Sequence, residues 1–537
     1  MSDSSAPVTP PLAGSRSTEA VDHGRSETGL TIARNSMWMM VDSLGAVIAS
    51  LYCSITVARS LGPDLMGQYN YLLYFATVLK MVAEVAIPAT VRKFAAEFVG
   101  RGDYVTVRTL VGHTLRLQTT LGGAALALGF AVVFTSFPVE QRLVASLAVL
   151  SILPAMLLSP AAGALAATES VRHNVVSSLG AIVANLVGVT VSLLAGWGLV
   201  GLTASLLVSR VVDCTLRFAL FHRVYARLPG RALRGTLDTS LRTRMIRFAA
   251  HQLLLGLLYA LLFDRMEIFF LKGLAHGRDI AFFSISFTFV SYVLQVPMNL
   301  AGSAQVSVWV QQGRAPDEAA RTTATATWFV MLLGAPLLFG VAAISDPLLR
   351  LLYGAKYLPA IPVMTVLSLL SLGLAVSQPA QFLLVGAERQ RFYLVWLGLA
   401  GLVSVVANLL LIPRYGPVGA AFAKGAGGVF GAIGFLGYLI MHFRVELPYR
   451  RMAKLLVACG TMLVCVRLVG RGLPSLPALL VGIPFGASIF LVLTRWLRVL
   501  DAADRARLLQ LDRLIPSRAR GAYVAVVDFL VPRILST

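Results

Sequence analysis

Two groups of charged residues lie inside apolar segments of the sequence. Lys80 and Glu84 are one helical turn apart on the same predicted helix face, and Asp264, Arg265 and Glu267 fall within a single helical turn. Ionisable side chains are costly in hydrocarbon, so such residues usually face a protein interior or a water-filled cavity. The cations could hold a phosphate and the carboxylates could carry a coupling ion. The alternatives are a self-neutralising packing pair at Lys80 and Glu84, and an interfacial charge cluster at residues 264–267.

Further charged residues occur singly or as a ladder. Lys424 has no acidic residue near it in the sequence, and is either a cavity cation or the partner of a distant carboxylate. Arg210, Asp213 and Arg217 share a helix face, which indicates a structural ion-pair ladder or a basic stripe along a substrate path. Asp42 could bind a cation or accept hydrogen bonds from neighbouring helices. Arg210 and Lys424 join Lys80 and Arg265 as candidate cavity cations, and Asp42 and Asp213 join the candidate ion carriers or charge partners.

The segments that must position these residues are transmembrane helices. Of 537 residues, 57% are hydrophobic and 13% are charged, with a mean hydropathy of +0.77, whereas soluble proteins carry about 25% charged residues. The apolar runs approach 20 residues, the length that crosses a bilayer. We predict about fourteen helices, at 36–58, 67–90, 115–136, 143–166, 175–196, 199–221, 247–271, 280–305, 323–344, 361–385, 392–412, 417–441, 452–470 and 476–495.

The formal net charge of +21 lies mostly in connections and tails between the apolar runs. Nucleic acid is therefore not an expected partner, and attraction to anionic lipid headgroups explains the charge better. Arginine and lysine favour one set of alternate connections by roughly two to one, and the rich side should be cytoplasmic. Both termini are then expected inside the cell. The outward connections are too short for a catalytic domain.

An internal repeat accompanies the helix pattern. Pro160-Ala161 aligns with Pro379-Ala380, and Glu169 then aligns with Glu388. The shift is six helices, an even number, so the halves share one orientation as parallel repeats do. We predict two six-helix lobes followed by two extra helices, with a substrate site between the lobes. The predicted parts are a disordered tail (1–33), an N-lobe (34–222), a basic linker (223–246), a C-lobe (247–441), two further helices (442–495) and a basic amphipathic tail (496–537).

Three stretches are predicted to lie on the membrane surface. Residues 92–114 and 501–515 mix apolar and charged residues at helical spacing, as expected for amphipathic surface helices. Residues 522–535 are too short to span and are expected at the interface. The first thirty residues lack the apolar core of a signal peptide.

Five motifs resemble a known family. They are ARSLGPDLMGQYNY (58–71), RKFAAEFVGRGD (92–103), LLYGAKYLPAIPVM (351–364), LLVGAERQR (383–391) and NLLLIPRYGPVGAAFA (408–423). In this order they are similar to the polysaccharide flippases, the Wzx-type polysaccharide transporter family of the multidrug/oligosaccharidyl-lipid/polysaccharide exporter superfamily. The segment LFDRMEIFFLKG also resembles the family's seventh helix, where an aspartate commonly lies near the position of Asp264.

The resemblance implies a function. Members carry a lipid-linked oligosaccharide, usually on undecaprenyl pyrophosphate, from the inner to the outer leaflet of the bacterial cell membrane for surface or exopolysaccharide assembly. It implies alternating access driven by a cation gradient, with H⁺ or Na⁺ as the coupling ion, and contacts with membrane lipids and other polysaccharide assembly proteins. The expected protein is therefore multi-pass, in the inner membrane, and not an enzyme.

Other functions compete with this interpretation. The nearest are a drug/cation antiporter and a lipid II flippase of the same superfamily, and further ones are a membrane-embedded polysaccharide polymerase or ligase and a membrane scaffold. A drug antiporter would have a smaller, more acidic site. We find no phosphate-binding nucleotide loop, no metal-ligand spacing among the cysteines and histidines, and no nucleophile paired with a base, so no cofactor or metal is expected.

Overall fold

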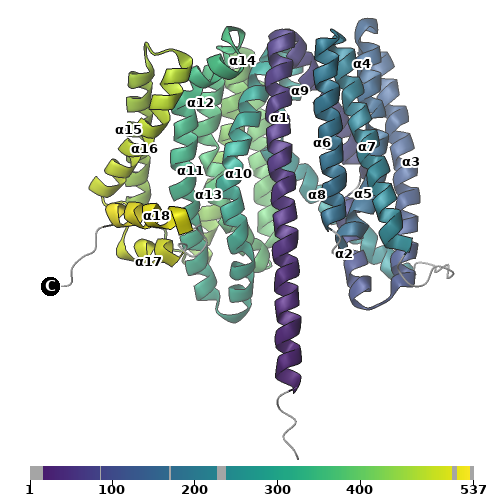
Figure 1. Ribbon diagram of the computed structural model, residues 1–537, viewed down its shortest axis with the longest axis horizontal. Coiled ribbons are helices and arrows are strands. Elements are labelled where there is room, and N and C mark those ends of the chain that lie inside the picture. The colour runs from purple at the N-terminus through teal and green to yellow at the C-terminus, as the bar shows by residue number, and fades with distance from the viewer. Residues whose placement is uncertain (1–15, 85, 168–170, 227–237, 511–516, 532–537) are drawn as a thin grey trace, which may run out of the picture. The chain divides into compact units, whose positions relative to one another are not determined.

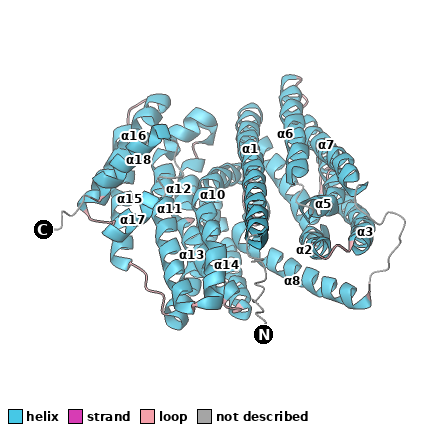
Figure 2. Ribbon diagram, turned by 60° about the horizontal axis from the view of Figure 1, so that its bottom comes forward, coloured by secondary structure: helices cyan, strands magenta, loops and turns pink. Residues whose placement is uncertain are grey.

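The computed structural model describes residues 16–531 except 85, 168–170, 227–237 and 511–516, and every regular element in this part of the chain is helical (Figures 1 and 2). A short 3₁₀ turn, η1, spans Ala355–Tyr357. The α-helices are α1 (Arg16–Glu84), α2 (Ile87–Gly100), α3 (Tyr104–Ser136), α4 (Val139–Leu150), α5 (Ile152–Ala167), α6 (Val171–Leu194), α7 (Gly198–Ala226), α8 (Thr239–Phe263), α9 (Glu267–Leu274), α10 (Gly277–Arg314), α11 (Pro316–Leu352), α12 (Ala360–Leu370), α13 (Leu372–Gly386), α14 (Gln390–Phe443), α15 (Tyr449–Gly470), α16 (Ser475–Trp496), α17 (Ala502–Gln510) and α18 (Ser517–Leu530).

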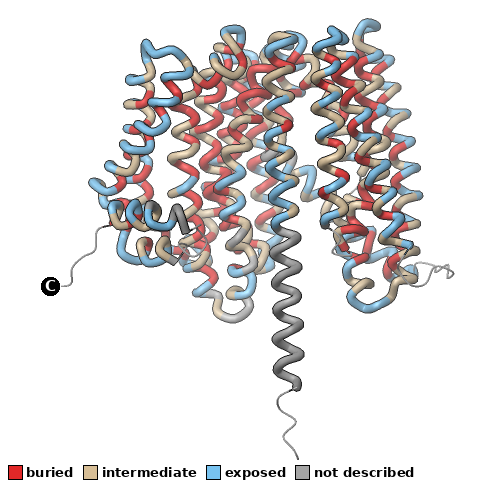
Figure 3. The backbone as a smooth tube through the Cα atoms, viewed as in Figure 1, coloured by how far each residue is buried: buried red, intermediate tan, exposed pale blue. Residues whose placement is uncertain are grey.

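The prediction of an all-helical polytopic membrane protein is confirmed. Eleven helical stretches in the described residues are long and apolar enough to cross a membrane. Buried and exposed residues alternate along the helices (Figure 3), and many exposed residues are large and apolar, such as Leu402, Leu410 and Ile433 of α14. Large apolar residues exposed in this number are consistent with a surface that contacts lipid. Two of the eleven stretches, α1 and α14, contain a break, and each covers two of the predicted helices. The total of fourteen transmembrane helices stays a prediction.

The break in α14 is a helical hairpin. Gly416 has φ 54° and ψ −130°, a conformation open to glycine but strained for other residues. A Cβ on Gly419 would clash with the carbonyl oxygen of Leu411, so the chain reverses between these two residues. The rings of Trp396 and Phe430 stack farther along the same two arms. The sequence predicted this turn at the correct place, between 412 and 417.

The break in α1 lies at Gly62, which has φ 75° and precedes Pro63. Arg59 just before it donates hydrogen bonds to the carbonyl oxygens of Leu351 and Leu352, the latter at 2.8 Å. The hydroxyl of Tyr357 donates to the carbonyl oxygen of Ala58 at 2.9 Å. Two motifs that are distant in sequence, 58–71 and 351–364, are therefore bonded to each other.

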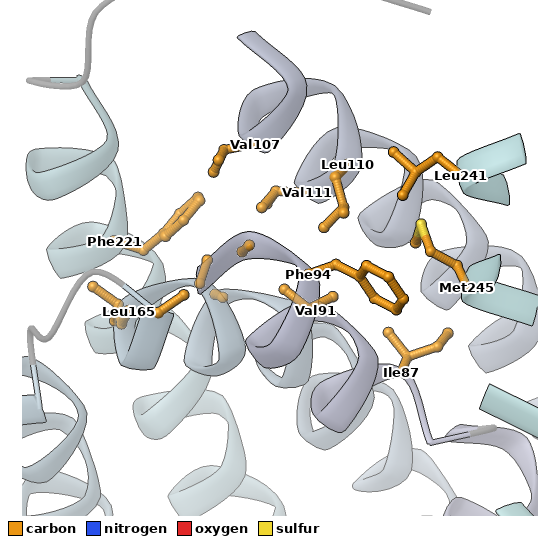
Figure 4. Packing of buried hydrophobic residues seen from close by; sticks show 14 residues of the cluster. Ile87, Val91, Phe94, Val107, Leu110, Val111, Leu165, Phe221, Leu241 and Met245 are labelled. Atoms are coloured by element: carbon orange, nitrogen blue, oxygen red, sulfur yellow. The ribbon is translucent and has the colours of Figure 1, made fainter. Parts of the chain in front are cut away.

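The chain divides into two compact units. The first comprises residues 1–50, 83–194 and 200–249, and the second comprises 51–82, 195–199 and 250–537. Figure 4 shows the core of the first unit, in which Val91 and Phe94 of α2 pack among apolar residues of α3, α5, α7 and α8. The predicted lobes and repeat stay predictions.

One expectation for the surface segments was wrong. Residues 92–114 do not form a single helix, because α2 ends at Gly100 and α3 begins at Tyr104. Gly102 has φ 72°, and the Asp103 side chain caps α3 by accepting a hydrogen bond from the Thr106 backbone N–H at 3.0 Å. A flexible residue followed by a capping residue ends one helix and begins the next. The predicted segment 501–515 contains α17, and most of 522–535 is within α18.

Candidate functional site

The predicted helix over 247–271 is interrupted, which places its charged residues at a helix break. Helix α8 ends at Phe263 and α9 begins at Glu267, so Asp264, Arg265 and Met266 lie outside regular helix. A carboxylate oxygen of Asp264 accepts a hydrogen bond from the Arg265 backbone N–H at 2.9 Å. The expectation of one continuous helix was therefore wrong. Discontinuous helices expose backbone groups that can bind ions or polar ligands inside a membrane protein.

Lys424 of α14 lies against this break. Its Nζ is 3.6 Å from Oε2 of Glu267, and the two side chains are 3% and 0% exposed. The same nitrogen donates a hydrogen bond to the backbone carbonyl oxygen of Asp264. The structure supports one of the two interpretations of Lys424, namely that it pairs with a carboxylate distant in the sequence. Burial of both groups also argues against an interfacial cluster, since headgroup contact requires exposure.

Arg265 extends to the neighbouring helix α10. Its Nη2 donates to the hydroxyl of Thr288 at 2.9 Å, and its guanidinium lies 5.1 Å from the ring centroid of Phe287. Lys424 Nζ lies 5.2 Å from the centroid of the same ring. Two cations therefore share one aromatic ring, whose π face attracts positive charge.

The carboxylate of Glu267 is the least satisfied member of this cluster. Both of its oxygens are buried, and no hydrogen bond reaches either of them from the described residues. The 3.6 Å separation from Lys424 is an ion pair but is longer than a good hydrogen bond. A buried carboxylate with free lone pairs can accept a proton or a small cation at little geometric cost. We call Asp264, Arg265, Glu267 and Lys424 the break cluster.

Asp213 and Arg217 form a separate network in the first unit. Arg217 donates to Asp213 at 2.7 Å and to the side-chain oxygen of Asn174 at 2.7 Å. The hydroxyl of Ser177 also donates to Asp213, at 2.6 Å. These bonds join α6 to α7, and both charged side chains are 9% exposed. The arrangement is that of a structural ion-pair clamp, while Arg210 on the same helix is exposed.

The remaining predicted residues lie outside these two clusters. Glu84 accepts a hydrogen bond from the hydroxyl of Ser159, and Lys80 is half-buried on α1. One carboxylate oxygen of Asp42 is buried without a hydrogen-bond partner in the described part of the chain. Among the described residues, no group of three or more His, Cys, Asp or Glu could hold a metal ion.

Sequence reasoning missed the neutral members of these clusters. Phe287 and Thr288 are ordinary residues of an apolar helix, and no spacing signal distinguishes them. Asn174 and Ser177 are three residues apart on one face of α6, and this polar pair in an apolar segment was a usable signal.

Comparison with known proteins supports the family resemblance found in the sequence. Residues 113–362, just under half of the chain, match a family described as Polysaccharide biosynthesis protein. No curated protein matches the chain by sequence.

Solved structures share the fold over most of the chain. "Lipid II flippase MurJ, inward closed conformation" has a TM-score of 0.67 at 13% identity, and the match covers 85% of this chain and 98% of that one. An inward-facing multidrug resistance MATE family transporter of the MOP superfamily has a TM-score of 0.62 at 16% identity, covering 77% and 98%. A MOP superfamily transporter from Pyrococcus furiosus has a TM-score of 0.55 at 14% identity, covering 77% and 95%. At these identities the likeness establishes the fold alone.

Proposed function

We propose that this chain, a membrane transporter of polysaccharide-flippase type with a MurJ- and MATE-like fold, moves a lipid-linked oligosaccharide repeat unit between leaflets. The carrier proposed is undecaprenyl pyrophosphate, and the direction is from the inner to the outer leaflet of the bacterial inner membrane, with both termini in the cytoplasm. The product would supply surface or exopolysaccharide assembly. Its partners are the glycolipid, the surrounding lipids and the proteins that polymerise the repeat units.

The observation that carries the proposal is the break cluster. It holds two cations, Lys424 and Arg265, beside the carboxylate of Glu267 at an interrupted helix. A pyrophosphate crossing about 30 Å of hydrocarbon needs buried cations that can exchange one anion for another. Lys424 already has an anionic partner, so a phosphate can replace that carboxylate and keep the lysine paired.

This exchange provides a coupling step. When phosphate takes Lys424, Glu267 loses its cation and becomes an uncompensated buried carboxylate. Uptake of H⁺ or Na⁺ by Glu267, with Asp264 beside it, would neutralise that charge. Binding of phosphate at Lys424 and binding of the coupling ion at Glu267 are thereby linked, and such a linkage between two ligands is the basis of ion-coupled transport. Lys80, Arg210, Asp42 and Glu84 are the remaining proposed substrate or ion sites, and Asp213 is proposed only as the charge partner of Arg217.

A drug/cation antiporter is the nearest alternative, because one of the similar structures is a MATE transporter. A site for cationic drugs needs net negative charge. The break cluster instead has two cations and two carboxylates. Its net charge is zero, so it lacks the excess negative charge that a cationic drug requires. Lipid II also carries pyrophosphate and fits the same charges.

The test is the leaflet distribution of the lipid-linked repeat unit in a deletion strain. With wild-type protein we expect the glycolipid in the outer leaflet, and without the protein we expect it trapped inside. Complementation with Lys424→Met, Glu267→Gln should leave it trapped, because the cation that exchanges its carboxylate partner for the phosphate is gone. Arg450→Gln, an exposed charge outside the cluster, should restore export.

Two results would separate the alternatives. If the glycolipid reaches the outer leaflet in the deletion strain, the flippase assignment fails. Drug sensitivity of that strain, with normal glycolipid distribution, would then identify the antiporter. If lipid II accumulates inside in place of the polysaccharide precursor, the carrier lipid class is correct and the glycan assignment is wrong.

A further inference from the structure

A polar cavity in the second unit shares no lining residue with the break cluster. It has a volume of about 560 Å³, within the range of small-molecule sites. Its walls come from the start of α11, the segment 443–448 between α14 and α15, the start of α15, and α17. Helix α17 contacts α18, which in turn packs on α16, and Figure 1 shows these two short helices beside the ends of the long ones.

The cavity contains arginines that are not already neutralised. Arg451 bonds Asp501 at 2.7 Å and Asp504 at 2.8 Å, so its charge is used by the protein. By contrast, Arg321 and Arg444 form no side-chain hydrogen bond or ion pair with any described residue. The same holds for Arg507 of α17, so three cavity arginines keep their donors available.

A buried donor on the cavity wall also lacks an acceptor. Trp328 of α11 is 2% exposed, and its indole N–H has no hydrogen-bond partner among the described residues. Its ring lies 5.1 Å from the guanidinium of Arg451, which fixes the ring in place. A buried N–H without an acceptor is destabilising, so a ligand oxygen that accepts from it would be stabilising.

The position of the cavity indicates the source of the ligand. Its lining residues occur between Asp317 and Trp328 at the start of the candidate span Asp317–Leu352, at Arg451 in the first turn of Tyr449–Gly470, and at the last residue of Gln390–Phe443. The ends of spanning helices lie at the level of lipid headgroups. Asp317, Glu446 and Asp501 also line the cavity, so its lining residues carry four positive charges against three negative ones. That balance suits one phosphodiester, with carboxylates left to accept headgroup hydroxyls.

We propose that this cavity binds the phosphodiester headgroup of an anionic phospholipid, with Arg444 and Arg507 holding the phosphate and Trp328 donating to it. The bound lipid would join α17 to the ends of α11 and α14. This role is independent of the flipping activity and of the break cluster. Arginine suits it because its planar fork offers several donors to phosphate oxygens.

The experiment is lipid binding to the full chain in detergent, followed by native mass spectrometry. The probes are phosphatidylglycerol, phosphatidylethanolamine and the soluble headgroup fragment glycerol phosphate. Wild-type protein should bind phosphatidylglycerol at least fivefold more tightly than phosphatidylethanolamine. The double variant Arg444→Gln, Arg507→Gln should abolish that preference, and Trp328→Phe, which keeps a ring but removes the N–H, should weaken it.

The matched control is Arg450→Gln, which removes a charge one residue from Arg451 on an exposed position outside the cavity. It should keep the preference within twofold of wild type. Equal losses in the control and the double variant would reduce the effect to general surface charge and overturn the proposal. Equal binding of the two lipids by wild type would also overturn it. Tight binding of glycerol phosphate alone would assign the cavity to a soluble phosphate and overturn the lipid assignment.

Discussion

The Nζ of Lys424 lies 3.6 Å from Oε2 of Glu267, and the rest of the protein encloses both side chains. Each residue comes from a different helix, and each compensates the charge of the other. Breaking one half of a buried ion pair costs about 3–5 kcal/mol, whereas replacing both halves with neutral groups is often nearly neutral. Single and double variants of Lys424 and Glu267 can therefore separate an effect on stability from an effect on transport.

For the break cluster, Lys424→Met alone should destabilise the protein by about 3–5 kcal/mol, because Glu267 remains buried and charged. Adding Glu267→Gln should recover most of this stability, measured as the thermal unfolding midpoint in detergent. Transport should stay at least tenfold below wild type in the double variant, because the phosphate-binding cation is still absent. A stable double variant that transports at the wild-type rate would make the pair purely structural.

The clamp formed by Asp213 and Arg217 between α6 and α7 should respond like the break cluster in stability but unlike it in transport. Arg217→Met leaves Asp213 buried without its cation and should cost about 3–5 kcal/mol. The double variant with Asp213→Asn should recover stability, and glycolipid export should return with it, because this network binds α6 to α7 and holds no substrate. Unfolding midpoint and export are measured on the same variants. A well-folded double variant without export would place the clamp in the transport path.

The break cluster and the clamp differ in how much of each could be predicted from the sequence. Charged residues in apolar segments stand out by composition, so Lys424, Glu267, Asp213 and Arg217 could all be found. The pairing of Arg217 with Asp213 was also accessible, because the two residues are one helical turn apart. The pairing of Lys424 with Glu267 was not, because it depends on how α9 and α14 pack.

The two helix breaks differ in the same respect, because one could be predicted from the sequence and the other could not. The turn at Gly416 is predictable from its glycine and the proline that follows, which interrupt the apolar pattern. The break at residues 264–266 has neither glycine nor proline, and its carbonyl group is held by Lys424 from another helix. Local residue types predict the first break, while only tertiary packing explains the second.

The hairpin in α14 should be sensitive to its central glycine. Gly416→Ala puts a Cβ on a residue with φ 54° and ψ −130°, a strain of about 1–3 kcal/mol. Gly437→Ala is the matched control in the same helix, because no atom lies within 4 Å of the added methyl group and the backbone there is helical. The first change should lower the unfolding midpoint and the second should leave it unchanged or raise it. Equal effects would mean that residue 416 is not strained.

The cap of α3 gives a pH-dependent prediction at a group outside the spans. Hydrogen bonds from the Thr106 side chain and backbone lower the pKa of Asp103, so the ionised form is favoured in the folded state. Its stabilisation is present above the ordinary aspartate pKa, near 3.9, and is lost as the pH falls through the lower folded value.

Asp103→Ala should therefore speed amide exchange in the first turn of α3 about fivefold at pH 7, which corresponds to the roughly 1 kcal/mol typical of a lost cap. Asp103→Ser keeps a capping oxygen without a charge, and should retain most of the protection at all pH values. Wild type and this serine variant should therefore differ only in acid, after correction for intrinsic exchange rates. If wild-type protection in this turn stays constant down to pH 2, the carboxylate does not provide the cap.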